Sequence, residues 1–72
     1  MTKADEQALK QGCQLLKERT IEPNLSIVLC FNQHAVQPYV TWLFNEQSNG
    51  FCWGHYFSDR SSAINDYFAR KQ

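Results

Sequence analysis

Apolar residues recur at helical spacing near both ends of the chain. In residues 2–20, small and apolar side chains fall at i, i+1, i+4, i+5 and i+8, which is one helical face: Ala8, Leu9, Gly12, Cys13 and Leu16. Thr2 followed by Asp5 has the spacing of a capping box, and Pro23 ends the pattern. A second helix is predicted over residues 59–70, with Asp59 as its cap.

The middle of the chain reads as strands. Residues 25–32, 39–44 and 51–57 are rich in β-branched and aromatic side chains. Asn49 and Gly50 form the pair most typical of a tight hairpin turn. The three segments therefore predict an antiparallel sheet.

These elements define the expected fold class. Residues 1–72 are expected to form one small α+β domain of order helix, strand, strand, strand, helix. Because both helices are amphipathic, they are expected to pack on one face of a three-stranded sheet as a two-layer sandwich.

The hairpin register decides which side chains share a face. A two-residue turn at Asn49 and Gly50 pairs Phe44 with His55 and Leu43 with Tyr56. The face with the largest rings, which includes Trp42, Phe44, Phe51, Trp53, His55 and Phe57, is then assigned to the core. The opposite face carries no charge, and it comprises Val28, Cys30, Tyr39, Thr41, Leu43, Cys52, Gly54 and Tyr56.

An uncharged, open sheet face predicts binding of a protein. Soluble monomers seldom expose large apolar patches, so the eight residues of this face are interpreted as a protein-binding site. The simplest partner is a second copy in a two-fold homodimer, and the other is a larger protein. A longer turn, or a bulge at Gly54, would exchange the faces, and the connection over residues 33–38 could cover one of them.

Charge and composition narrow the classes of function. Seven Lys and Arg balance seven Asp and Glu among 72 residues, which argues against nucleic acid as the partner and favours self-association. The sequence shows no signal peptide and no membrane span, so three reduced cysteines in the cytoplasm are expected. One disulfide with a free thiol is the alternative. The size is typical of a regulatory or accessory protein of a phage or bacterium.

Metal and catalytic chemistry are weakly indicated. Cys30 and His34 lie four apart and Cys52 and His55 three apart, a donor set that zinc accepts. Residues at i and i+3 of a strand point to opposite faces, so no metal site is predicted. No cofactor and no catalytic residue is predicted either. A chain this short leaves little room for a pocket, and the protein is expected not to be an enzyme. Asp66 is interpreted as a surface charge.

The expected order of elements is similar to that of the double-stranded RNA-binding domain. His34 lies between the first two strands, as a histidine does in that family, and the likeness covers topology over the whole chain. The family places a lysine cluster at the start of its last helix, where this chain has Asp59 and Arg60. The resemblance implies RNA binding as the alternative function. Binding of a single strand through stacking on Tyr39 and Tyr56 belongs to the same alternative.

Overall fold

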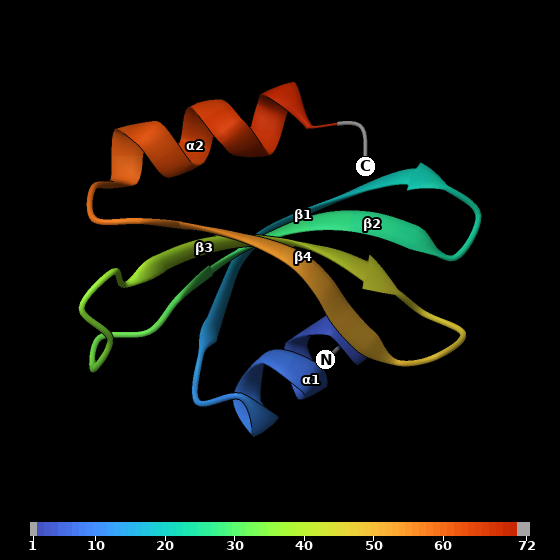
Figure 1. Cartoon of the computed structure of the whole chain (residues 1–72). Coiled ribbons are helices and arrows are strands. Elements are labelled where there is room, and N and C mark those ends of the chain that lie inside the picture. Colours follow the sequence, from blue (N-terminus) through green and yellow to red (C-terminus); the bar gives the residue numbers. More distant parts are fainter. Residues whose placement is uncertain (1, 71–72) are drawn as a thin grey trace.

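The computed structural model describes residues 2–70, and it has a β-sheet that lies between two helices (Figure 1). In chain order they are α1 (Lys3–Lys10), β1 (Gln14–Glu22), β2 (Leu25–Phe31), β3 (Tyr39–Asn45), β4 (Gly50–Phe57) and α2 (Arg60–Ala69). The strands form one antiparallel sheet of order β1-β2-β3-β4. The α+β class, the antiparallel sheet and the two helices are confirmed, whereas the prediction of three strands is wrong.

The two helices cover opposite faces of the sheet (Figure 1). The α1-side cluster consists of Ala4, Ala8, Cys13, Val28, Cys30, Val40 and Phe44. The α2-side cluster consists of Ile27, Leu29, Leu43, Ala63 and Tyr67. Consecutive residues of β2 and β3 thus enter different clusters, as expected of strands buried on both faces. The prediction that both helices share one face is therefore wrong. The physical reason is that β2 and β3 are apolar on both sides, so each side of the sheet needs a helix to cover it.

The first helix is shorter than its pattern predicted. Thr2 and Asp5 form the capping box, but the helix ends at Lys10, and Gly12 follows with φ of +77°, a left-handed conformation that favours glycine after a helix. The predicted helical residues 14–20 instead belong to β1, which pairs with β2. Two register shifts in β1 move its apolar side chains off a strict two-residue alternation. This irregular spacing explains why the segment resembles a helix in sequence.

The β3–β4 hairpin also differs from its predicted register. Phe44 pairs with Phe51 rather than His55, and the turn spans residues 46–49. Trp53 and Gly54 together lie opposite the single residue Trp42, which defines a β-bulge. Both alternatives considered from the sequence, a longer turn and a bulge at Gly54, therefore occur together.

The bulge permits close approach of Trp42 to the backbone of β4. A Cβ atom added to Gly54 would lie 2.6 Å from Trp42 Nε1 and 2.9 Å from Trp42 Cδ1. Real side chains do not approach so closely, so the absence of a side chain at Gly54 determines where the indole packs. The isolated glycine inside a strand pattern is the sequence signal for this feature.

We predict that Gly54→Ala destabilises the protein by about 1–3 kcal/mol, since the new methyl group must displace the indole of Trp42. Urea denaturation measures the change. Gly50→Ala is the matched control, because a Cβ at Gly50 meets nothing nearer than 3.8 Å. Equal stability of the two variants would contradict the packing described.

Candidate functional site

The eight residues predicted to form one binding face do not lie on one open face. Val28 and Cys30 are fully buried in the α1-side cluster. Thr41 is fully buried and Leu43 is almost so, and Leu43 packs in the α2-side cluster. The premise of an open face is therefore wrong for these four positions, because a helix covers each side of the sheet.

The other four predicted residues lie at the periphery of the sheet. Tyr39 is half-buried against the α2-side cluster, and Gly54 is half-buried beside Trp42. Cys52 and Tyr56 are exposed, both on β4. Their partners in β3, Leu43 and Val40, enter different clusters, so the bulge places Cys52 and Tyr56 on opposite faces. The exposed residues of the predicted site, Cys52 and Tyr56, thus both belong to β4.

The two edges of the sheet differ in charge. The edge strand β1 carries four charged residues: Lys17, Glu18, Arg19 and Glu22. The edge strand β4, with sequence GFCWGHYF, carries no Lys, Arg, Asp or Glu. Charged side chains on an edge discourage pairing with another chain, and β4 has none of them. Four of its eight residues are exposed: Cys52, Trp53, His55 and Tyr56.

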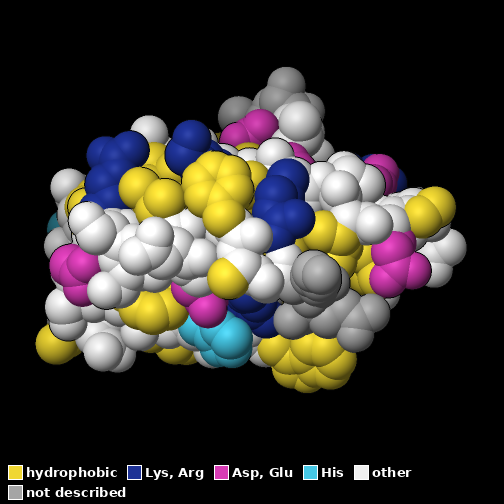
Figure 2. Space-filling view, turned by 90° about the horizontal axis from the view of Figure 1, so that it is seen from above, with side chains coloured by type: hydrophobic (Ala, Val, Ile, Leu, Met, Phe, Trp, Pro, Cys, Tyr) yellow, Lys and Arg dark blue, Asp and Glu magenta, His cyan; other side chains and the backbone are white. Residues whose placement is uncertain are grey.

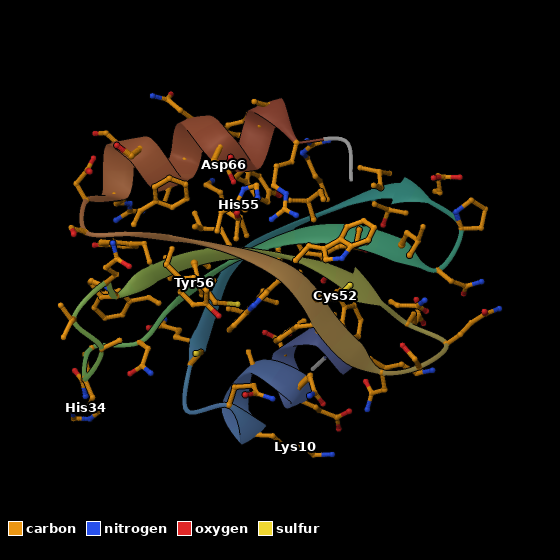
Figure 3. The ribbon with its side chains drawn as sticks, viewed as in Figure 1. Lys10, His34, Cys52, His55, Tyr56 and Asp66 are labelled. Carbon is orange, nitrogen blue, oxygen red and sulfur yellow. The ribbon has the colours of Figure 1, made fainter. Side chains whose placement is uncertain are left out.

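A polar network connects β3, β4 and α2 beneath the second helix (Figure 3). The Thr41 hydroxyl donates to Asp66 Oδ2 at 2.5 Å, and His55 Nδ1 lies 3.0 Å from the same oxygen. Since a carboxylate only accepts hydrogen bonds, His55 Nδ1 is the donor. Arg70 Nη1 donates to the Thr41 hydroxyl at 3.1 Å and to the Thr41 carbonyl at 3.0 Å. Asp66, which the sequence analysis interpreted as a surface charge, therefore fastens the helix to the sheet together with Arg70.

A second arginine caps the C-terminal end of α2. The Arg19 guanidinium, from β1, donates to the carbonyls of Tyr67, Phe68 and Arg70. A cation at this end of a helix satisfies carbonyls that lack intrahelical partners and complements the helix dipole. Arg19 thus has a structural role that periodicity did not reveal. The other end of α2 is capped by Asp59, as predicted, through the Ser62 amide at 2.9 Å.

The His55–Asp66 pair is oriented but does not extend to a nucleophile. Within residues 2–70, no hydroxyl or thiol is hydrogen-bonded to the His55 ring. Cys52 lies farther along β4, and His34 lies at the loop between β2 and β3 (Figure 3). The four residues considered for zinc are not brought together. No group of three His, Cys, Asp or Glu side chains in the described part of the chain could hold a metal ion.

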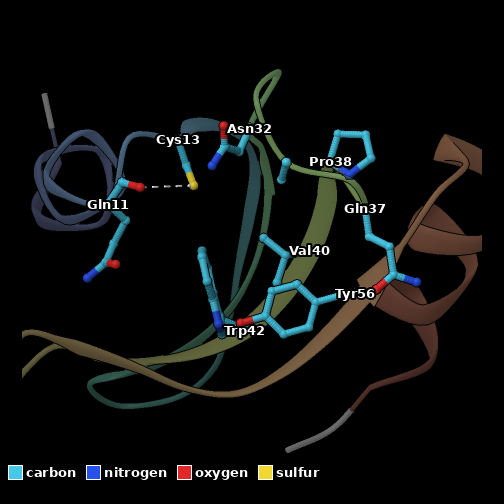
Figure 4. A pocket seen from close by; sticks show the side chains of 9 residues that line it. Gln11, Cys13, Asn32, Gln37, Pro38, Val40, Trp42 and Tyr56 are labelled. Atoms are coloured by element: carbon cyan, nitrogen blue, oxygen red, sulfur yellow. Dashed lines mark hydrogen bonds between the residues drawn. The ribbon is translucent and has the colours of Figure 1, made fainter.

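A hollow of about 160 Å³ opens on the α1 side, between the end of α1, the loop over residues 32–38 and β4 (Figure 4). Its lining contains no charged residue: Gln11, Cys13, Asn32, Ala35, Gln37, Pro38, Val40, Trp42 and Tyr56. Asn32 and Cys13 point into it from one side, and the rings of Trp42 and Tyr56 lie opposite them (Figure 4). Helix α1 ends at Lys10 and is too short to cover this part of the sheet. The sequence analysis did not predict the hollow, because it expected a longer helix over residues 2–20.

The face that α2 covers shows no large patch of one charge. Apolar, basic and acidic side chains are interspersed over it (Figure 2). A surface of this kind lacks the basic stripe that phosphate binding requires. No helix within residues 2–70 is long and apolar enough to cross a membrane.

Comparison of the chain with protein-family models, with curated proteins and with solved structures finds no match. The topological likeness to the double-stranded RNA-binding domain rested on three strands. The fourth strand, and the placement of the helices on opposite faces, depart from that expectation. The structure shows the architecture, a four-stranded antiparallel meander between two helices.

We predict that Thr41→Val lowers the free energy of unfolding by about 1–3 kcal/mol, because Asp66 and Arg70 both lose a buried partner. Urea denaturation tests this. Ser61→Ala, which removes an exposed hydroxyl of α2, is the control and should change stability by less than about 0.5 kcal/mol. A neutral effect of the first variant would mean that the network contributes no net stability.

The three cysteines, which are all free, should differ in reactivity. Cys52 is exposed, whereas burial raises the pKa of the Cys30 thiol from 9.0 to about 12 and also raises the pKa of Cys13. We expect a thiol reagent at pH 8 to modify Cys52 first and Cys30 last, as read by mass spectrometry of peptides. Early modification of Cys30 would contradict its burial.

The same shift in the pKa of Cys30 predicts how stability depends on pH. The unfolded thiol ionises near pH 9, while the folded thiol stays protonated until about pH 12. The contribution of Cys30 to stability is therefore complete below pH 9 and is lost as pH rises from 9 to 12. Cys30→Ala should show a smaller loss of stability over that interval than the unmodified chain.

Proposed function

We propose that this protein is a small non-enzymatic binding module that forms a homodimer by pairing the β4 edges of two copies. The observation that carries the proposal is the uncharged outer edge of β4. Within residues 2–70, the backbone hydrogen bonds made outside the helices and strands include none from Gly50–Phe57. An uncharged edge strand whose outer backbone groups are not paired is a template for addition of another strand.

The contrast with β1 supports the choice of edge. Both edge strands have irregular register, yet only β1 combines this with charged side chains. The bulge at Trp53 and Gly54 interrupts β4, so an added strand is expected to pair with the segments on either side of it. The exposed ring of Trp53 then supplies apolar contact beside the backbone pairing.

A second copy suits this edge better than a charged partner does. Two β4 strands related by a two-fold axis run antiparallel, and the contact is the same on both copies. Neither strand brings a charge that needs a counter-charge, and the net charge of the chain is zero. The product would be a continuous sheet with the helices of both copies on its two faces.

Such a dimer fits an accessory or regulatory protein that presents its remaining surface to a larger protein. The three free cysteines fit a reducing compartment such as the cytoplasm. RNA binding is the other candidate function. It needs a basic surface, and the α2-covered face does not supply one (Figure 2).

We predict that the chain forms a dimer that dissociates on dilution, and that Trp53→Lys shifts it toward monomer by at least about tenfold in dissociation constant. Trp53 is 64 % exposed, so the substitution removes no core contact. Light scattering over a hundredfold dilution, roughly the range needed to cross a dissociation constant, measures the mass.

Phe68→Lys provides the control, because Phe68 is 62 % exposed but belongs to α2 rather than to β4. It should leave the dimer intact. A monomer at every concentration would contradict the proposal, as would equal weakening by both variants. RNA binding at low salt that falls steeply as salt rises would instead favour the alternative function.

A further inference from the structure

The hollow of Figure 4 offers a flat aromatic surface to a ligand. Phe51 stacks on one face of Trp42, with ring centroids 4.6 Å apart and an interplanar angle of 10°. Phe51 pairs with Phe44, and the hollow lies on the other side of Trp42, toward Val40. The indole face turned away from Phe51 therefore borders the hollow. Tyr56 meets Trp42 at 88°, so the two rings form a right-angled corner.

The polar groups around this corner include hydrogen-bond donors without partners. The Asn32 side-chain oxygen already accepts from the His34 amide at 3.0 Å, which leaves the Asn32 amide nitrogen as a donor. Within residues 2–70, neither that nitrogen nor the Tyr56 hydroxyl has a hydrogen-bond partner. Asn32 points into the hollow from the side opposite Tyr56 (Figure 4). A ligand between them would be held by its hydrogen-bond acceptors.

Size and charge restrict the ligand further. The volume of about 160 Å³ is roughly half of the smallest pockets that hold drug-sized molecules, so it suits a single ring. None of the lining residues is charged, which gives no counter-charge for a phosphate or carboxylate. Gln11 and Gln37 flank the opening with their amide ends pointing away (Figure 4). Both side chains are exposed and free to rotate over a bound ring.

We propose that the hollow binds a neutral, planar ring bearing carbonyl oxygens, the chemistry of a pyrimidine base such as uracil or its nucleoside. The ring stacks on the part of the Trp42 indole that borders the hollow beside Tyr56, as bases stack on aromatic side chains elsewhere. Its carbonyl oxygens accept from the Asn32 amide and the Tyr56 hydroxyl. Binding at this site does not require the dimer, because every lining residue belongs to one chain.

The test is a titration of the full chain with uridine, followed by two-dimensional amide NMR. We expect saturable shifts of the Trp42 indole signal with a dissociation constant of about 1 mM, and no shift of the exposed Trp53 indole, which serves as an internal control. Uridine 5′-monophosphate should bind within about threefold of uridine, since no lining group recognises its phosphate.

Two variants separate recognition from folding. Asn32→Asp keeps the oxygen that accepts from His34 but removes the amide donor, so uridine should bind at least about tenfold more weakly. Tyr56→Phe keeps the ring but removes the hydroxyl, and should weaken binding roughly fivefold. Asn65→Asp makes the same chemical change at an exposed position of α2, and should leave affinity within about twofold.

Several results would overturn the proposal. No saturable shift up to about 10 mM uridine would exclude a specific site. Equal binding of glucose, which is neutral but not planar, would show that stacking plays no part. Unchanged affinity in both Asn32→Asp and Tyr56→Phe would show that the donors are not used. A monomeric chain that still binds uridine would contradict the dimer alone, and a dimer that ignores uridine would contradict this proposal alone.

Discussion

The structure depends on the burial of both faces of the central strands. Ile27, Val28, Leu29 and Cys30 are consecutive in β2, and each is fully buried. Burial of one such apolar side chain is worth about 1.5–3 kcal/mol, so leaving either face in water would cost much of the stability of a domain this small. Two short helices, one on each face, are the solution that the chain adopts (Figure 1).

The helices are held in different ways because they differ in what they cover. Helix α1 presents Ala4 and Ala8 to the sheet, small side chains that allow close approach over Val28 and Cys30. Helix α2 adds a polar fastening to its apolar contacts, through Asp66 and the arginines at its C-terminal end. The short α1 leaves part of its face uncovered, and the hollow beside Tyr56 occupies that part.

The sequence predicted the elements better than their arrangement. Strand composition located β2, β3 and β4, and the caps at Thr2 and Asp59 were correct, because these signals are local. The strand β1 was missed because Leu15 and Leu16 both face apolar layers, on opposite sides of the sheet, and so imitate helical spacing.

The candidate site was less predictable, because it depends on register. A two-residue turn and an unbroken strand would have placed Cys52 and Tyr56 on one face, and the bulge at Gly54 separates them. The Thr41–Asp66 hydrogen bond joins residues 25 positions apart, and no local pattern encodes it. What the sequence did show was an uncharged aromatic segment at β4, and that segment remains central to the proposed function.

The order of the strands has a consequence for how the chain folds. Each strand of the sheet pairs with its immediate neighbour in sequence, so the loops closed during folding are short. Folding rates rise as the mean sequence separation of contacts falls, because less chain entropy is lost before contacts form. The long-range steps are those that bring Arg19 to the end of α2, across 48 to 51 positions. We therefore expect the meander to form early and the docking of α2 to complete the native state.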